Sequence, residues 1–449
     1  MRIAWFGPAR DTGGVPGMGA LLLESVLERG AQVDLYTNDD PSELPARLAG
    51  ARGLRVIRSK TSWQWGRWYS RRPFAAFVSG TMSRARRHGR LCRALLEENA
   101  RRPYDCIFQL SQLELLGLRR HVNELPPIVV YPCVHAAGEL HWHRRESAYA
   151  RQSEGLLMHY VVRLVLTYRS FVQKRDARRP AFIVGMSRRF NEIIARDYGV
   201  SPRRQAVLYD PIRMSEPAES SNRDVATDAQ ASPSPASPAS PRPVKLLYVA
   251  RLSVRKGLDQ IVELTRRLDD LHGRVQIEVI GCRRQWSDYS KHLRELNPRV
   301  ARFVGELKHE QTMTAYEQAD GLLLPSLYEP GGLVVGEALS RGACVVASDA
   351  VGSAELLSRP CCRSFPAGDL GAFEQEVRRL VQEIERDPAA LRERAKREAW
   401  RHFSPRAAAD QLLSILGRAA RLRADAGARV APTAPTSAWP AAAPLARTP

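Results

Sequence analysis

Two glutamates flank a glycine-rich turn in the segment SLYEPGGLVVGEALSRG. Glu329 and Glu337 are separated by seven residues, and Pro330-Gly331-Gly332 lies where a helix is expected to begin after a buried strand. Glycine allows the backbone to approach a ligand closely. The N-terminus of a helix offers free N–H groups and a partial positive charge to a phosphate or to sugar hydroxyls. Glu337, about two turns into this helix, is near enough to accept hydrogen bonds from a ribose.

Two cations stand at the end of another predicted strand, in the run KLLYVARLSVRKGLDQ. Arg251 follows the strand directly, and Lys256-Gly257 begins the next helix. Cations at a strand end and at a helix N-terminus can clamp a diphosphate. They can also neutralise the charge on a departing nucleoside diphosphate, so we expect neither a metal ion nor a cofactor.

In this order the two segments resemble the GT-B glycosyltransferases of family 4, the retaining glycosyl transferases of group 1. The matching residues are Arg251-Leu252, Lys256-Gly257, Glu329-Pro330-Gly331-Gly332, Glu337-Ala338 and Gly342. The resemblance is dense in the C-terminal half and loose in the N-terminal half. It implies an α/β protein in which two doubly wound, Rossmann-like domains face each other across a cleft. It also implies a metal-independent, retaining hexosyltransferase whose substrate is a nucleotide sugar.

The resemblance gives each matching side chain a donor-binding role. Arg251 and Lys256 look like the ligands of the donor diphosphate. Glu329 looks like the residue that binds the hydroxyls of the donor sugar, and Glu337 looks like the ribose ligand. His135, in the N-terminal half, completes the expected catalytic set with Glu329 and the two cations.

Backbone groups are also expected to contact the donor. By the resemblance, Gly331, Gly332 and Leu333 supply N–H groups to the donor sugar or its phosphates. Gly281, which follows the strand IEVI, lines the nucleobase pocket. Gly14, in the glycine turn after the first strand, touches the donor phosphate and the acceptor.

Three positions in the N-terminal half follow predicted strands. His135 comes after IVVYPCV and matches a histidine that the family places beside the reacting sugar. A satisfied structural histidine is the open alternative, because His141 and His143 are close by. Ser187 follows FIVGM and resembles a serine at the end of the last N-terminal strand. Tyr209-Asp210-Pro211 departs from the family pattern, so no role is transferred to it.

Short apolar runs alternate with amphipathic helical patterns in both halves, which indicates parallel sheets covered by helices. A Ser/Pro/Ala-rich segment without apolar periodicity interrupts them. The predicted units are an acceptor-binding domain (1–213), a disordered linker (214–243), a nucleotide-sugar-binding domain (244–403), a helix that can cross back to the N-terminal domain (404–423) and a disordered Ala/Pro-rich tail (424–449). Ligands bind beyond the carboxyl ends of such strands, so we expect the active site in the cleft between the domains.

The strands predicted for the N-terminal half are Arg2–Phe6, Gln32–Tyr36, Cys106–Gln109, Ile128–Cys133, Ala181–Gly185 and Ala206–Leu208. Those predicted for the C-terminal half are Val244–Val249, Gln276–Ile280, Gly321–Leu324 and Ala343–Ala347. Helices are predicted over Ala20–Arg29, Leu258–Asp270 and Leu333–Arg341, with two more within Asp369–Phe403 and one from Ser404-Pro405 onward.

The chain is strongly basic. Its 449 residues include 68 Lys and Arg against 48 Asp and Glu, a formal net charge of +20. Such a field attracts polyanions or an anionic membrane through a salt-screened effect, although it can also reflect composition alone. The basic stretch Arg144–Arg179 can dock on a membrane or cover the sheet. The Trp/Arg segment 62–74 can contact the acceptor or a membrane, or pack on the core.

Cysteine usage and the N-terminus bear on the compartment. The seven irregularly spaced cysteines fit buried free thiols in a reducing environment. The N-terminus MRIAWFGPARD lacks the apolar stretch of a signal peptide. Leu156–Tyr168 is broken by His159 and Arg163 and is too short to span a bilayer. We expect a cytoplasmic protein, or one that is peripheral at the inner face of the membrane.

Several enzyme classes are excluded, because the sequence lacks a P-loop, a zincin motif, a nucleophile elbow and the Asp-x-Asp of metal-dependent transferases. Two alternatives stay open: another enzyme of this architecture, such as a sugar-nucleotide epimerase, and a non-catalytic basic protein that binds nucleic acid or an anionic membrane. The intact donor motifs argue for the enzyme and make nucleic acid the less expected partner. UDP is the expected donor base. The acceptor hydroxyl can belong to a glycan, a lipid-linked intermediate or a specialised metabolite.

Overall fold

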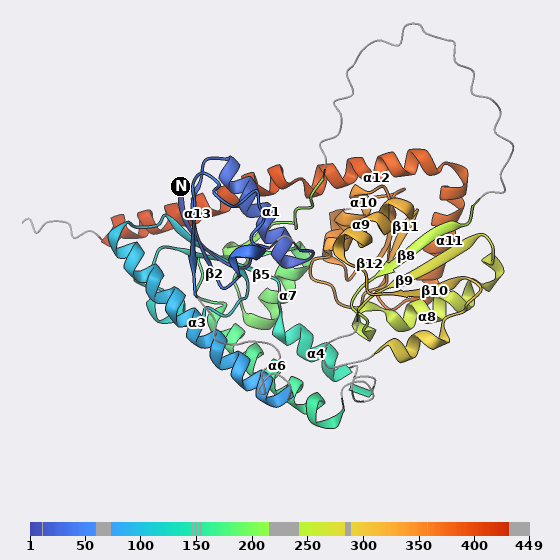
Figure 1. Ribbon diagram of the computed structural model, residues 1–449, viewed down its shortest axis with the longest axis horizontal. Helices are drawn as coiled ribbons and strands as arrows, with labels where there is room; N and C mark the ends of the chain where they lie inside the picture. The colour runs from blue at the N-terminus through green and yellow to red at the C-terminus, as the bar shows by residue number, and fades with distance from the viewer. Residues whose placement is uncertain are drawn as a thin grey trace, which may run out of the picture.

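The computed structural model describes residues 1–10, 12–59, 73–145, 147, 148, 151, 155–214, 242–282, 289–356 and 358–430. Within these residues the chain forms two α/β domains, each built on a parallel sheet with helices packed against it (Figure 1). The fold class predicted from the alternation of apolar runs and helical patterns is confirmed.

Seven strands form the N-terminal sheet in the order β3-β2-β1-β4-β5-β6-β7. Their bounds are β1 Arg2–Phe6, β2 Gln32–Thr37, β3 Leu54–Arg58, β4 Cys106–Ser111, β5 Ile128–Pro132, β6 Phe182–Gly185 and β7 Gln205–Val207. All pairings are parallel. The central strands are buried almost end to end, because helices cover both faces of the sheet.

The helices of this domain form two layers. Helices α1 (Val15–Glu28) and α7 (Arg188–Tyr198) share one apolar core with the sheet. Helix α3 (Pro73–Arg101) covers the opposite face through Leu91 and Leu95. Helix α4 (Ala136–Arg145) packs against α6 (Leu156–Asp176). Short 3₁₀ turns lie at Pro41–Glu43, Leu116–His121 and Pro202–Arg204.

Six parallel strands form the C-terminal sheet in the order β10-β9-β8-β11-β12-β13. Their bounds are β8 Val244–Val249, β9 Val275–Ile280, β10 Ala301–Gly305, β11 Gly321–Leu324, β12 Cys344–Ser348 and β13 Cys362–Phe365. The helices around it are α8 Leu258–Arg267, α9 His309–Gln318, α10 Leu333–Ser340, α11 Leu370–Arg386 and α12 Pro388–Phe403. The 3₁₀ turns are Val254–Lys256, Asp269–Leu271, Tyr289–Glu295 and Gly352–Leu356.

The last helix, α13 (Pro405–Val430), leaves the C-terminal domain and lies along the N-terminal domain (Figure 1). Its buried residues Ala409, Leu412, Leu416 and Ala419 belong to the same apolar core as α1 and the N-terminal sheet. The chain therefore ends on the domain in which it began, and α13 ties the two domains together.

The end of α13 corrects one prediction. The disordered tail was expected from residue 424, but the helix continues through residues 424–430. This run, ADAGARV, contains three alanines, and alanine has the highest helix propensity of all residues. The three alanines of this run therefore extend the helix.

The sequence patterns missed three strands, β3, β10 and β13, and each lies at an edge of its sheet. The sequences LRVIR, ARFVG and CRSF mix arginine with apolar residues. An edge strand has a neighbour on one side only and tolerates such polarity, so the apolar run that marks a central strand is absent. Helix α1 also begins at Val15 rather than Ala20, because Pro16 suits the first helical turn.

Several predictions lie outside the described residues: the linker from 215 to 241, the Trp/Arg segment from 62 to 72 and the tail from 431 to 449. All seven cysteines are described, and none forms a disulfide; five of them are buried. In the described part of the chain, no helix has both the length and the apolar content needed to cross a bilayer.

We expect Leu416→Ala to lower the free energy of unfolding by about 2–5 kcal/mol, because the substitution leaves a cavity between α13 and the N-terminal sheet. Leu422 lies on the same helix but is 54% exposed, so Leu422→Ala should change this free energy by less than about 0.5 kcal/mol. Urea denaturation followed by circular dichroism measures both variants. Equally small effects would show that α13 does not stabilise the domain.

Candidate functional site

Both sheets reverse their strand order once, and the candidate site residues gather at these reversals. In the first sheet the reversal lies between β1 and β4, and in the second sheet it lies between β8 and β11. Loops that follow the two strands at such a point diverge to opposite faces and leave a crevice at the carboxyl edge. Arg251 and Lys256 follow β8, and Glu329 follows β11.

Lys256 and Glu329 form an ion pair between the Lys256 Nζ and a Glu329 carboxylate oxygen. The two side chains are only 13% and 17% exposed. Burial lowers the pKa of the Lys256 ammonium well below its usual value, and the guanidinium groups of Arg255 and Arg251 lower it further. Contact with the Glu329 carboxylate favours the charged amine. The two side chains are held against each other at the carboxyl edge of the C-terminal sheet.

Backbone hydrogen bonds join the two loops that carry this pair. The N–H of Leu327 donates to the carbonyl of Arg255 over 2.8 Å. Gly257, in the loop after β8, has a φ of 75°, and a Cβ atom there would lie 2.1 Å from the Pro325 carbonyl oxygen in the loop after β11. Glycine is therefore required, because any side chain would force the loops apart and separate Lys256 from its partner.

The glycine turn opens α10. Gly332 is the N-cap residue, with a φ of 117°, and it has no side chain to cap the helix. The N–H of Val335 donates to the Gly332 carbonyl over 2.9 Å, whereas no side chain caps the N–H groups of Leu333 and Val334, which can be offered to a ligand. Gly331 faces the other domain, where a Cβ atom would lie 2.9 Å from Asp210 Oδ2 and 3.0 Å from Met186 Sδ.

The remaining positions predicted for the donor site are Glu337, Gly281 and Arg251. Glu337 lies on α10, and burial raises the pKa of its carboxyl to about 7. Gly281 follows β9, and a Cβ atom there would lie 2.3 Å from the Ala250 carbonyl oxygen, so glycine allows β9 and β8 to end close together. Arg251 is exposed at the end of β8. All three lie at or beside the same edge of the C-terminal sheet.

In the N-terminal domain, Gly14 is the N-cap of α1, with a φ of 74°. Among the described residues, a Cβ atom at Gly14 would meet no atom within 4 Å, so the loop is open at this point. One residue earlier, a Cβ atom on Gly13 would lie 2.8 Å from Nδ1 of His309, which begins α9. The loop after β1 therefore reaches the C-terminal domain.

His135 is buried at the contact between the domains. Its Nδ1 accepts a hydrogen bond from the Gly138 N–H over 3.1 Å and lies 2.7 Å from the hydroxyl of Tyr328. Because Nδ1 accepts, the ring proton is on Nε2, which lies 3.3 Å from an oxygen of Asp197. Burial lowers the pKa of His135 to about 4, against the opposing effect of the carboxylates of Asp197 and Glu139.

The geometry supports a positioning role for His135. It bonds to Tyr328, the sequence neighbour of Glu329, rather than presenting an exposed ring to the crevice. These contacts agree with the alternative that His135 is a structural histidine. A catalytic role for His135 stays a prediction.

Further contacts between the domains were not foreseen from the sequence. Arg255 Nη2 lies 3.2 Å from Glu139 Oε1 of α4. The Ser187 hydroxyl donates to the Pro330 carbonyl over 2.9 Å, while its Oγ accepts from the N–H of Phe190 at the start of α7. The sequence offers two hints, the adjacency of Arg255 to Lys256 and the place of Ser187 after a predicted strand, but it does not reveal the partners, which are far apart in the chain.

Glu355 adds a contact of the same kind. Its carboxylate oxygens accept hydrogen bonds from the backbone N–H of Arg188 over 2.7 Å and from the Tyr209 hydroxyl over 2.7 Å. A carboxylate at a helix N-terminus is stabilised by the partial positive charge there. The C-terminal domain thus caps a helix of the N-terminal domain.

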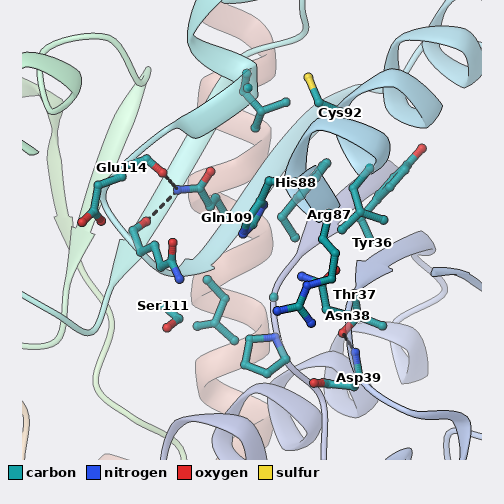
Figure 2. A pocket seen from close by; sticks show the side chains of 18 of the residues that line it. Tyr36, Thr37, Asn38, Asp39, Arg87, His88, Cys92, Gln109, Ser111 and Glu114 are labelled. Carbon is teal, nitrogen blue, oxygen red and sulfur yellow. Dashed lines mark hydrogen bonds between the residues drawn. The ribbon is translucent and has the colours of Figure 1, made fainter. Parts of the chain in front are cut away.

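A cavity lies at the reversal of strand order in the N-terminal sheet (Figure 2). It has a volume of ≈ 320 Å³ and is bounded by the carboxyl ends of β1, β2 and β4 and by α3. Its polar and charged lining residues are Arg10, Thr37, Asn38, Asp39, Arg87, His88, Gln109, Ser111, Gln112 and Glu114. The sequence patterns predicted none of these residues as functional.

This cavity offers several hydrogen-bonding groups. Gln109 is fixed by donating to the carbonyls of Gln112 and Glu114 over 2.7 and 3.0 Å. Asn38 Oδ1 and Glu114 Oε2 are buried without a hydrogen-bond partner among the described residues. Ser111 has a φ of 85°, a strained conformation that often accompanies function. Unmet acceptors of this kind suit a ligand rich in hydroxyl groups.

No group of three or more His, Cys, Asp or Glu residues in the described ranges is arranged to hold a metal ion. The two cations and the helix N-terminus are the groups that can bind an anion at the C-terminal crevice. Metal independence stays a prediction.

Comparison with known proteins finds sequence similarity mainly in the C-terminal half of the chain. Residues 233–399 match the family model described as Glycosyl transferases group 1. The glycogen synthase of Mycobacterium tuberculosis is 33% identical over 158 residues, which cover 34% of this chain and 37% of that protein. The amylovoran biosynthesis glycosyltransferase AmsK of Erwinia amylovora is 32% identical over 193 residues, which cover 40% of this chain and 46% of AmsK. The chain spans less than half the length of these curated relatives.

Solved structures match over nearly the whole chain. The sucrose-phosphate synthase of Thermosynechococcus elongatus has a TM-score of 0.63 at 18% identity, covering 95% of this chain and 100% of that one. HepE of Anabaena, solved with UDP-glucose, has a TM-score of 0.58 at 15% identity, covering 93% and 100%. The two domains therefore have the GT-B fold, as the resemblance of the sequence implied.

The burial of His135 predicts a pH dependence of stability. The unfolded imidazole takes up a proton below its usual pKa of about 6.5, whereas the folded one does so only near 4. The unfolded state thus binds more protons between these values, and the free energy of unfolding should fall by about 1.4 kcal/mol per pH unit on acidification.

In His135→Asn, which keeps an acceptor for Tyr328, this part of the acid dependence should be absent. Tyr328→Phe serves as the matched control, because it removes a hydroxyl, costs about 0.5–1.5 kcal/mol and leaves the imidazole buried. Urea denaturation at several pH values measures all three proteins. An identical slope in His135→Asn and the native chain would show that His135 does not titrate in this way.

Proposed function

Because residues 233–399 make the C-terminal half a member of the glycosyl transferases group 1, we propose that the protein is a retaining glycosyltransferase. It moves a hexose from a nucleoside-diphosphate sugar to an acceptor hydroxyl. The observation that carries the proposal is the Lys256–Glu329 pair, held at the strand reversal beside the uncapped N-terminus of α10. Cation, carboxylate and free N–H groups are the three kinds of group that a sugar diphosphate needs.

The donor lies along the carboxyl edge of the C-terminal sheet. Arg251 and Lys256 bind the diphosphate, and the N–H groups that begin at Leu333 add donors. Glu329, released from Lys256, accepts hydrogen bonds from the sugar hydroxyls, and Glu337 accepts from the ribose. Gly281 leaves room for the base. UDP is the proposed nucleotide, in keeping with the UDP-glucose complex of HepE.

Cations in a partly buried crevice stabilise the charge that develops on the leaving diphosphate. The acceptor oxygen forms a bond to the anomeric carbon as the bond from that carbon to the diphosphate oxygen breaks. The acceptor proton passes to the departing phosphate, and attack from the same face retains the configuration. No metal ion is required, because the charge is neutralised by Arg251 and Lys256.

The acceptor binds at the N-terminal reversal. Asn38, Gln109 and Ser111 offer hydrogen-bonding groups there, and the loop after β1 carries Gly14 toward the C-terminal domain. A hydroxyl-rich acceptor, such as a glycan or the sugar of a lipid-linked intermediate, fits this lining. A cytoplasmic location with access to the inner membrane face suits such an acceptor.

Nucleotide binding tests the donor site. We expect one of UDP, GDP, ADP and dTDP, without added metal, to stabilise the purified protein, by about 2.7 kcal/mol at a hundredfold excess over its Kd. UDP is the expected one, and thermal denaturation measures the shift. Arg251→Ala and Lys256→Ala should abolish it.

Arg299→Ala is the matched control, because this arginine pairs with Asp269 on the surface and is 56% exposed. It should keep the full shift. If no nucleotide stabilises the native chain, or if Arg299→Ala is as damaging as Lys256→Ala, the diphosphate clamp is refuted.

Transfer itself is tested with radiolabelled UDP-glucose and a panel of saccharide and polyol acceptors. Lys256→Ala should lower the rate by about 10²–10³-fold, because it removes a charge that stabilises the leaving group. Asn38→Ala should lower transfer by about tenfold while leaving the thermal shift with UDP unchanged. NMR of the product should show the anomeric configuration of the donor; an inverted product would rule out the retaining mechanism.

A further inference from the structure

Helix α6 exposes a continuous apolar stripe. Leu157, Tyr160, Leu164, Tyr168 and Phe171 are 77%, 57%, 71%, 67% and 67% exposed. They follow one another at intervals of three and four residues, so all five lie on the same face of the helix. Exposed apolar residues are normal when scattered, whereas a contiguous row of this kind marks an interaction surface.

The opposite face of α6 packs against the N-terminal domain. His159 stacks on His143 of α4 at a centroid distance of 4.4 Å, and Val172 and Gln173 are buried. Gln173 accepts the N–H of Ala136 over 2.8 Å, which fixes α6 against the start of α4. Packing of the inner face therefore holds the stripe outward.

Cations surround the stripe. Arg144 and Arg145 are exposed at the end of α4, which packs against α6, and Lys174 and Arg175 are exposed at the end of α6 itself. The only acid on α6, Asp176, is buried and lies 3.3 Å from Arg119 and 3.0 Å from Arg175. The sequence from 140 to 179 contains nine basic and three acidic residues.

We propose that this face of α6 docks on an anionic phospholipid membrane. The leucines and Phe171 enter the boundary between headgroups and acyl chains, where the tyrosine hydroxyls remain at the headgroup level. The flanking arginines and lysines contact anionic headgroups, an attraction that the net charge of +20 reinforces.

The position of α6 suits this role. Figure 1 shows it at the outer edge of the N-terminal domain, away from the C-terminal sheet. A symmetric contact with a second copy through the same face is less favourable, because it would bring the flanking cations of both copies together. The charge around the stripe thus selects an anionic partner over a second copy of this chain.

Flotation of the full chain with vesicles tests the proposal. We expect binding to vesicles of phosphatidylcholine mixed with phosphatidylglycerol, at least about tenfold weaker binding to phosphatidylcholine alone, and release from the mixed vesicles at high salt. The variant Leu157→Ser/Leu164→Ser/Phe171→Ser should lose at least about tenfold in affinity for the mixed vesicles. Its melting temperature should stay near that of the native chain, because the three side chains contact solvent.

Leu422→Ser, another exposed leucine on α13, is the matched control and should bind vesicles like the native chain. The double variant Lys174→Glu/Arg175→Glu, which keeps the apolar stripe, should lose binding to anionic vesicles. The proposal is overturned if the native chain binds no vesicles, or if the serine variant binds as well as the native one. It is also overturned if light scattering shows a native dimer that the serine variant dissociates while vesicle binding is unchanged. Since vesicles alone are the probe, the result does not depend on transferase activity.

Discussion

The contact between the Lys256 ammonium and the Glu329 carboxylate is the interaction on which the candidate site depends. Two charges with so little exposure are stable only if each finds a partner, because desolvation alone would be costly. Their loops are fixed by the bond from Leu327 to Arg255 and by the close approach of Gly257 to Pro325. The loops therefore hold the two side chains against each other at the carboxyl edge of the C-terminal sheet.

The same loop connects the two domains. Tyr328 bonds to His135, and the carbonyl of Pro330 accepts from Ser187, so the residues on both sides of Glu329 are held by the N-terminal domain. A movement that opens the domains must break these bonds and shift Glu329 with them. The segment that carries Glu329 is therefore physically coupled to the N-terminal domain, as expected where domain closure assembles a site.

The two reversals of strand order explain why one fold provides two sites. Each sheet leaves a crevice where loops diverge, one beside β8 and β11 and one beside β1 and β4. The first crevice is lined by the charged pair and the second by amides, hydroxyls and arginines. Helix α6 belongs to the domain with the second crevice, and its Arg169 pairs with Glu114, which lines the N-terminal cavity.

The sequence by itself determined the central strands and placed the predicted donor residues at their carboxyl ends. Glycines, charges and buried central strands are local features, so spacing together with the family resemblance singled out Lys256, Glu329 and the Gly331-Gly332 turn, whose donor roles stay predictions. The edge strands β3, β10 and β13 could not be identified in this way, because their polarity is tolerated only by position in the sheet. Tertiary structure alone decided that His135 meets Tyr328, that Asn38 faces a cavity and that one face of α6 stays exposed. Each of these depends on which distant segment lies opposite, and local sequence carries no record of that neighbour.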